Sequence, residues 1–271
     1  MYLKQWMVLG VMGLLSFKTP HTNRIHNDKN PGKKMPTLLT GAYNAPQAVA
    51  KLVDSIYNQM HLSAYGLDRN VFFIAYKGYL HLLSQKHLKK PGIITVCDYS
   101  QPSSRKRLYV LDLNVGTLLF NTYVAHGKNS GGTYTSSFSN MNSSHKSSLG
   151  FMITDDTYFG SNGYSLRFNG LERGINDQVR NRAIVMHGSY YVNAERAMRG
   201  TMMGRSYGCP AVPASEVYEI IETIKGGTCY FAYYPNQWYL NSSAIINAPN
   251  FSWPTEVMAA NVATHSKVTT K

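Results

Sequence analysis

One histidine and one cysteine in the last third of the chain have the residue types and surroundings that nucleophilic catalysis needs. His187 is followed by Gly188, and Cys209 lies in the stretch Gly204-Arg205-Ser206-Tyr207-Gly208-Cys209-Pro210. A cysteine becomes a strong nucleophile when its pKa is lowered or its proton is removed, and a nearby imidazole does both. We therefore treat Cys209 as a candidate nucleophile and His187 as its candidate base.

The glycines of this region indicate how the pair is assembled. His187 lies 22 positions before Cys209, and the several glycines between them allow the chain to fold back. Gly208 leaves room for a substrate carbonyl beside Cys209 and lets backbone N–H groups point at a developing oxyanion. A lone histidine and cysteine are more often structural, so the interpretation depends on these glycine-rich surroundings.

The composition favours a β-rich, turn-rich protein with a basic surface. The chain has 271 residues, 44% hydrophobic and 15% charged, enough for one large domain or one domain with a smaller attachment. Its 20 tyrosines and 22 glycines are typical of strands and turns. The net charge of +13 suggests an anionic partner, but charge alone does not choose among nucleic acid, an anionic polymer and a membrane surface.

Residues 1–17 resemble an export signal. Lys4 precedes a mostly apolar run from Trp6 to Phe17, which is shorter than the roughly 20 residues of a membrane span. The residues after it do not form a good cleavage site. We expect export to the cell envelope, with this segment either removed or kept as an N-terminal membrane anchor; the alternative is a buried or interfacial segment.

The three cysteines leave at least one free thiol. If Cys209 is the nucleophile, Cys97 and Cys229 either pair or remain buried and reduced, and the sequence leaves both alternatives open. None of the three lies in a Cys-x-x-Cys pair, and no histidine spacing matches a known ligand pattern. The sequence therefore predicts no metal and no cofactor.

Hydrophobic periodicity divides the chain into five segments. They are the signal or anchor at 1–17, a linker at 18–42, a helical hairpin segment at 43–90, a catalytic domain at 93–235 and a C-terminal extension at 236–271. The hairpin has helices over 47–61 and 68–88. The predicted strands cover 93–97, 108–113, 117–124, 150–154, 164–168, 182–186 and 228–234, and a helix covers 213–225. Residues 127–148 form a long polar loop, and the extension lacks periodicity and is expected to be peripheral.

The region from about residue 98 to residue 213 resembles a known enzyme family. The pairing of His187-Gly188 with Ser206-Tyr-Gly-Cys209 is similar to the catalytic motif of the L,D-transpeptidases, a His-Gly followed by Ser/Thr-His-Gly-Cys. The closer resemblance is to a divergent branch, the murein L,D-transpeptidase catalytic domain, which has the YkuD-like fold. Shared stretches include Arg107-Leu-Tyr-Val-Leu-Asp112, Val124-Ala-His-Gly-Lys-Asn-Ser-Gly131, Gly170-Leu-Glu172 and Cys209-Pro-Ala-Val-Pro213.

The resemblance implies a mainly β fold with peripheral helices, in which a β-sandwich catalytic domain holds the cysteine. It assigns the nucleophile to Cys209 and the base to His187. The carbonyl of Gly188 or Ser189 would orient the imidazole, and the N–H groups of Gly208 and Cys209 would form the oxyanion hole.

The motif departs from the family at two places that bear on substrate choice. Tyr207 stands where the family has a histidine, and Pro210-Ala211 replaces the usual arginine or asparagine. Arg205 and Ser206 are expected either to shape the turn or to bind a substrate carboxylate. His126 and His145 lie in matched stretches on either side of the long loop, where they would contact substrate or hold the loop by hydrogen bonds.

The expected function is an exported, periplasmic enzyme that acts on peptidoglycan stem peptides. Cys209 would attack the carbonyl of the third stem residue, release the terminal D-amino acid and form a thioester. Transfer to an amine of a neighbouring stem gives a 3→3 crosslink, whereas transfer to water makes the protein an L,D-carboxypeptidase. The alternative is a non-catalytic wall-binding protein. Binding to nucleic acid is supported by charge alone, so we expect none.

Overall fold

The computed structural model describes residues 46–203 and 205–248. The predicted signal or anchor at 1–17, the linker at 18–42, Gly204 and the end of the predicted C-terminal extension, 249–271, lie outside the described residues.

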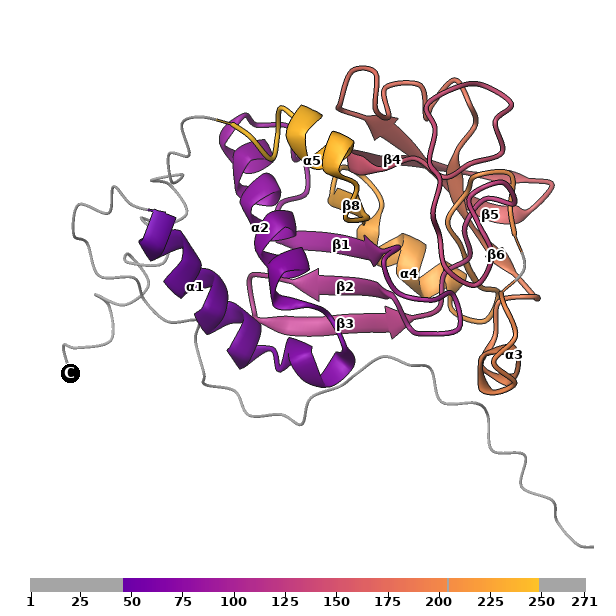
Figure 1. Ribbon diagram of the computed structural model, residues 1–271, viewed down its shortest axis with the longest axis horizontal. Helices are drawn as coiled ribbons and strands as arrows, with labels where there is room; N and C mark the ends of the chain where they lie inside the picture. Colours follow the sequence, from indigo (N-terminus) through magenta and orange to yellow (C-terminus); the bar gives the residue numbers. More distant parts are fainter. Residues whose placement is uncertain (1–45, 204, 249–271) are drawn as a thin grey trace, which may run out of the picture.

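The strands form one mixed sheet of eight members, in the order β3-β2-β1-β8-β4-β5-β6-β7. The strands are β1 (Ile93–Asp98), β2 (Leu108–Asp112), β3 (Thr117–Thr122), β4 (Gly150–Gly160), β5 (Gly163–Gly170), β6 (Val185–Ser189), β7 (Ala211–Pro213) and β8 (Cys229–Tyr233). β1 and β8 are parallel, as are β6 and β7. Ala125, just beyond β3, bridges to Ala211 of β7, so the two edges of the sheet meet and the sheet nearly closes. Figure 1 shows β1, β2 and β3 side by side next to α1 and α2.

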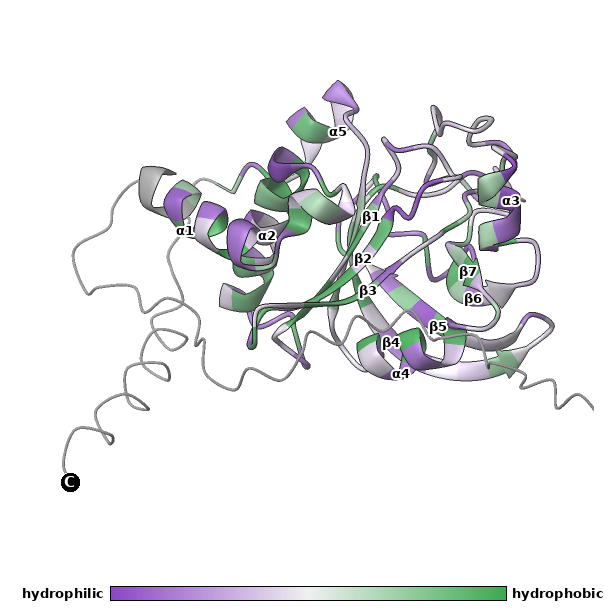
Figure 2. Cartoon of the chain, turned by 90° about the horizontal axis from the view of Figure 1, so that it is seen from below, coloured by the Kyte–Doolittle hydropathy of each residue, from purple (hydrophilic) through white to green (hydrophobic). Residues whose placement is uncertain are grey.

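Helices cover the sheet at its two ends. α1 (Pro46–Gln59), the 3-10 turn η1 (Leu62–Tyr65) and α2 (Arg69–Ser84) lie beside β1, β2 and β3, while α3 (Ala194–Met198) lies at the opposite end beside β6 and β7 (Figure 2). The Asp68 carboxylate caps α2 by accepting from the N–H groups of Asn70 and Val71. α4 (Val217–Ile224) contacts β1, β5 and β6, and its buried isoleucines join the main core.

Gly78 in the middle of α2 allows the helix to approach the sheet. A Cβ atom at this position would lie 2.0 Å from Cζ of Phe151 on β4. Phe151 is fully buried, and its ring stacks on that of Phe231 with centroids 4.1 Å apart. Gly78 is therefore a point of close contact between the helix and the sheet.

The prediction of a mainly β protein with peripheral helices is confirmed, with the strands of the predicted sandwich forming one bent sheet. Several predicted element boundaries are wrong: β4 runs to Gly160 rather than ending at residue 154, and α2 ends at Ser84 rather than at residue 88. Two further differences have a local cause. β6 begins at Val185 rather than at residue 182, because Arg182, Ala183 and Ile184 hydrogen-bond back to residues 178–180 in a turn, with Ala183 at a φ of 51°. The helix predicted from residue 213 begins at Val217, because Pro213 belongs to β7 and pairs with Ser189.

The beginning of the predicted C-terminal extension packs into the core rather than lying at the periphery. α5 (Gln237–Ser242) places Tyr239 at 0% exposure. The Tyr239 hydroxyl and the Ser243 hydroxyl both donate to the Glu172 carboxylate, which also accepts from the N–H of Phe151. Glu172 is thus a buried junction between α5 and β4, and burial raises the pKa of its carboxyl.

Cys97 and Cys229 are both buried and free. The parallel register places Cys229 opposite Ile94, three residues from Cys97. Because side chains alternate between faces, the two thiols lie on opposite faces of the sheet, about 10 Å apart along the strand. Of the two alternatives that the sequence left open, the structure has the reduced, buried pair.

The Gly78→Ala variant should be less stable than the wild type although alanine is the better helix former. The helix-propensity gain is about 1 kcal/mol, whereas forcing a methyl group against a packed ring costs about 1–3 kcal/mol. We expect the free energy of unfolding, measured by urea denaturation, to fall by up to about 2 kcal/mol. In a protein that already carries Phe151→Leu, the ring is gone. Adding Gly78→Ala there should lower the free energy of unfolding by less than it does in the wild type. A Gly78→Ala variant more stable than the wild type would contradict this account.

Candidate functional site

His187 is positioned by its place in β6. The strand holds it opposite Ser165 of β5 and Ala211 of β7, so these three side chains share one face of the sheet. The Nδ1 atom lies 2.9 Å from the carbonyl oxygen of Gly188, which can only accept a hydrogen bond. Nδ1 therefore carries the proton, and Nε2 is left as the acceptor. Burial lowers the pKa of His187, which keeps the imidazole neutral; the bond to Gly188 opposes this in part.

The turn that carries Cys209 requires glycine at position 208. Gly208 has a φ of 121°, and a Cβ there would lie 2.7 Å from Cδ1 of Ile184 and 2.8 Å from the carbonyl oxygen of Lys146. The Ser206 hydroxyl donates to the carbonyl of Cys209 at 2.6 Å and accepts from the N–H of Gly208 at 3.1 Å. Ser206, which is 8% exposed, thus shapes the turn, and the N–H of Gly208 is occupied by it.

The Cys209 sulfur sits against the turn that precedes β6. The N–H of Val185 donates to Sγ at 3.5 Å, and the thiol donates to the carbonyl of Ala183 at 3.7 Å. Burial raises the pKa of the thiol, and the Val185 N–H and the Arg182 charge oppose this in part. In the part of the chain that the structure describes, the sulfur makes no hydrogen bond to His187. The structure therefore holds a neutral thiol and a neutral imidazole, not an ion pair.

Arg182 is a functional candidate that the sequence analysis did not single out. Its guanidinium donates to the carbonyls of Ser139 and Lys146, at 2.5 and 2.6 Å, and to the hydroxyls of Ser148 and Ser144, at 2.6 and 3.1 Å. It therefore holds the long polar loop against the residues that contact Cys209. No sequence motif marks this role, because all four acceptors lie 34 to 43 residues away in the chain.

His126 is buried behind the site rather than exposed at its surface. Its Nδ1 lies 2.8 Å from Nη2 of Arg107, and both side chains are 0% exposed. Burial, together with the Arg107 charge, lowers the pKa of His126 to about 4. The neutral Nδ1 accepts from the guanidinium, so His126 is paired with Arg107. The two roles expected for it, contact with substrate and holding the loop, stay predictions. The described residues contain no group of three or more His, Cys, Asp or Glu that could hold a metal ion.

Tyr207, His145, Lys128 and Arg205 lie together at the surface next to Cys209. The ring of Tyr207 is 67% exposed and stacks on His145, with ring centroids 4.4 Å apart and an interplanar angle of 24°. Nζ of Lys128 lies 4.3 Å from the Tyr207 centroid, within the range of a cation–π contact. The Arg205 guanidinium donates to the carbonyls of Lys128 and Gly131. We call these four residues the basic rim.

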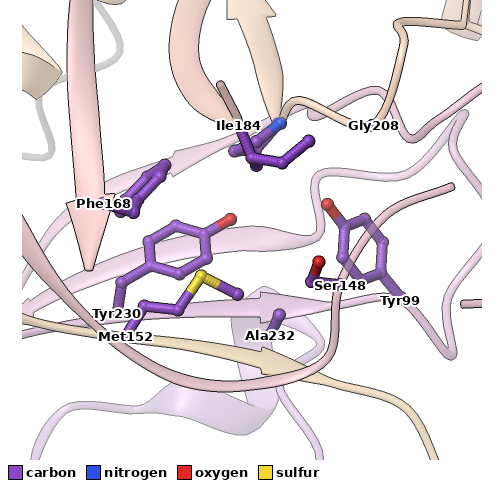
Figure 3. A pocket seen from close by; sticks show the side chains of 9 residues that line it. Tyr99, Ser148, Met152, Phe168, Ile184, Gly208, Tyr230 and Ala232 are labelled. Carbon is purple, nitrogen blue, oxygen red and sulfur yellow. The ribbon is translucent and has the colours of Figure 1, made fainter. Parts of the chain in front are cut away.

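A small cavity lies on the other side of the Cys209 turn. Gly208, Ile184, Tyr99 and Tyr230 are among its lining residues, and the two tyrosine hydroxyls point toward Ile184 and Gly208 (Figure 3). Its volume of about 10 Å³ has room for about one water-sized group. The cavity is therefore too small to hold a peptide.

One protein-family model and several solved structures are similar to this chain. The model of a family described as the L,D-transpeptidase catalytic domain matches residues 63–233. Solved structures similar to this chain include an L,D-transpeptidase from Mycobacterium tuberculosis H37Rv, at 11% identity and a TM-score of 0.35, with 53% of this chain and 58% of that one covered. An L,D-transpeptidase from Mycobacterium smegmatis shares 10% identity at a TM-score of 0.33, covering 53% and 59%.

A third similar structure is an L,D-transpeptidase from Stackebrandtia nassauensis, at 14% identity and a TM-score of 0.32, with 76% of this chain and 86% of that one covered. The chain thus spans less than two thirds of the length of the two mycobacterial proteins. No curated protein matches the sequence significantly.

Replacing Arg182 should make Cys209 less reactive, because the guanidinium charge favours the thiolate. In Arg182→Gln we expect the pH profile of Cys209 alkylation by iodoacetamide to move to higher pH, with a roughly five- to tenfold lower rate at pH 7.5. Peptide mass spectrometry measures the modification at Cys209. Arg182→Lys keeps the charge and should retain most of the reactivity.

Arg180→Gln is the matched control for this measurement, because Arg180 lies two residues away and pairs with Asp155 and Asp156 at the surface. It should leave the profile unchanged. An unshifted profile in an Arg182→Gln protein that melts at the wild-type temperature would show that the charge does not act on the thiol.

Proposed function

This chain belongs to the L,D-transpeptidase catalytic domain family, and we propose that it is an exported cysteine acyltransferase that acts on peptidoglycan stem peptides. The observation that carries the proposal is the state of the His187 imidazole. The Gly188 carbonyl fixes the proton of His187 on Nδ1, which leaves Nε2 free to accept a proton. Ala211, two residues after Cys209, pairs with His187 across β6 and β7. A general base for a thiol needs such a free acceptor nitrogen. Residues 1–17 would supply the export signal.

The proposed reaction begins with neutral partners. The Cys209 thiol leaves its contact with Ala183, transfers its proton to Nε2 of His187, and attacks the carbonyl carbon of the third stem residue. The carbonyl oxygen becomes an oxyanion, the C–N bond to the terminal D-amino acid breaks, and the imidazolium returns its proton to the departing amine. The product is a thioester on Cys209.

Resolution of the thioester decides between the two activities. An amine of a neighbouring stem that attacks the thioester carbonyl restores the thiol and gives a 3→3 crosslink. Attack by water releases the shortened stem, as in an L,D-carboxypeptidase. We propose the transpeptidase reaction as the main one, with hydrolysis as its alternative.

The contacts of the turn bear on the proposed oxyanion hole. The Gly208 N–H donates to Ser206, so it would have to exchange that hydroxyl for the oxyanion. The Cys209 N–H helps to lower the pKa of its own thiol and lies beside the sulfur. We therefore propose that the N–H of Cys209 is the first donor to the oxyanion.

The basic rim would recognise the carboxylates of the stem peptide. Lys128 and Arg205 are the cations of the rim, and the stacked rings of Tyr207 and His145 lie beside Lys128. Stem peptides end in carboxylates, which a cationic rim attracts. The same attraction would draw the protein to an anionic wall.

A second candidate function is wall binding without catalysis. It is favoured by one observation, the absence of a hydrogen bond between the thiol and the imidazole, because Cys209 donates to Ala183 instead. The basic rim would serve such a protein equally well.

Incubation with purified muropeptides separates these functions in one mass spectrum. We expect loss of the terminal D-amino acid together with 3→3 dimers for the wild type, and at least a thousandfold lower rate for Cys209→Ala. Shortened stems without dimers would indicate the carboxypeptidase. Cys97→Ala is the matched control, since Cys97 is buried and free and its removal should leave the products unchanged. Intact muropeptides after incubation with the wild type would refute catalysis on this substrate.

The pH dependence should reflect a neutral His187. Activity falls as the imidazole is protonated, and the pKa of His187 lies below its ordinary value because of burial. The acid limb of the kcat/KM profile should therefore lie below pH 6.5. His187→Gln should lower kcat/KM by roughly 10²- to 10⁴-fold. A limb near pH 4 that is lost in His126→Gln would instead assign the essential base to His126, whose pKa is about 4.

A further inference from the structure

A second pocket lies between the long polar loop and α5. It has a volume of about 260 Å³ and is lined by residues 136–140 of the loop, by Leu149 and Ile175, and by Asn236 and Trp238 at the start of α5. This is large enough for about one sugar-sized ring, near the lower end of ligand pockets in proteins. It shares no lining residue with the cavity behind Cys209.

The pocket is polar but carries no charge. No Lys, Arg, Asp or Glu lines it, although the chain as a whole has a net charge of +13. The hydroxyls of Ser136 and Ser137 make no hydrogen bond within the described part of the chain, and the Asn236 side chain uses only its oxygen, to cap α5. These groups can donate to and accept from a neutral, hydroxyl-rich ligand. An anionic ligand would find no cation here.

Trp238 provides a flat apolar surface on a rigid support. Its side chain is 60% exposed, whereas the next residue, Tyr239, is 0% exposed and anchors α5 to the Glu172 carboxylate. Burial of Tyr239 and the Asn236 cap fix the helix, so little freedom is lost when a ligand stacks on the indole. The apolar side chains of Phe138 and Ile175 lie in the same pocket and could cover a methyl group.

We propose that this pocket binds one ring of an N-acetylated saccharide, with the C–H face of the sugar on Trp238. The serine hydroxyls and the Asn236 amide would meet the sugar hydroxyls, and the apolar side chains would meet the acetamido methyl. Identifying the saccharide as the glycan strand of peptidoglycan rests on the proposed function. The binding of an N-acetylhexosamine does not.

The long polar loop connects this pocket with the thiol. Ser139 lies in the pocket lining, and its carbonyl accepts from Arg182, which also donates to the carbonyl of Lys146 beside Gly208. A glycan bound at Trp238 would therefore rest on the same loop that supports the Cys209 turn. Such an arrangement would hold a stem peptide near the thiol by its sugar end.

Binding of chitotriose, the trimer of N-acetylglucosamine, tests the proposal without catalysis. We would use the full chain carrying Cys209→Ala and measure the dissociation constant by saturation-transfer NMR or calorimetry. We expect millimolar binding that weakens at least fivefold in Trp238→Ala, with partial recovery in Trp238→Phe. Phe159→Ala is the matched control, because Phe159 is an exposed aromatic residue on β4 (81%), away from the pocket lining, and its removal should change nothing.

The ligand arms identify the chemistry. Cellotriose, which lacks the acetamido groups, should bind at least fivefold more weakly than chitotriose. Equal binding of chitotriose to the Cys209→Ala protein with and without Trp238→Ala, or no binding at 10-mM-scale concentrations, would overturn the proposal. Chitotriose binding without muropeptide processing would leave the saccharide site standing and refute the proposed function; processing without chitotriose binding would do the reverse.

Discussion

The arrangement around Cys209 depends on the hydrogen bonds of one half-buried cation. Arg182 donates to four acceptors in residues 139–148. It is followed in the chain by Ala183 and Val185, the two residues whose backbone contacts the sulfur. Taking a guanidinium out of water is costly unless its donors are satisfied, and here carbonyls and hydroxyls satisfy them without a carboxylate. The positive charge therefore remains uncompensated by an acid, and it opposes the burial that raises the pKa of the thiol.

The same region shows why the thiol rests in its neutral form. Burial raises the pKa of Cys209 and lowers that of His187, so the two effects both act against an ion pair. In the proposed reaction, proton transfer from the thiol to the imidazole would therefore accompany attack by the sulfur, and the negative charge would appear on the oxyanion. A protonated thiol is also oxidised more slowly, because the thiolate is the reactive species.

The sequence predicts the long periodic elements well and the local exceptions poorly. The amphipathic pattern after Asp68 marks α2, and alternation marks β2 and β3, because one face of each element meets the core. α5 was missed because six residues are too few to show a period; it is held by a buried carboxyl from another part of the chain, Glu172. The role of Arg182 also has no signal in the sequence, because its hydrogen-bond partners are distant along the chain. Motif spacing predicts Cys209 and His187 as site residues, but it does not predict the contacts that shift their pKa values.

The tyrosine at position 207 has a physical explanation in the basic rim. A histidine there would meet Lys128 with a ring that becomes cationic when protonated, and two cations at that distance repel. The Tyr207 ring cannot take up a proton, and its electron-rich face attracts the Lys128 ammonium 4.3 Å from the centroid, a contact worth about 0.5–1 kcal/mol at an exposed site. Tyr207 also stacks on His145. Tyr207 therefore holds the Lys128 ammonium against its ring in the basic rim, two residues before Cys209 in the chain.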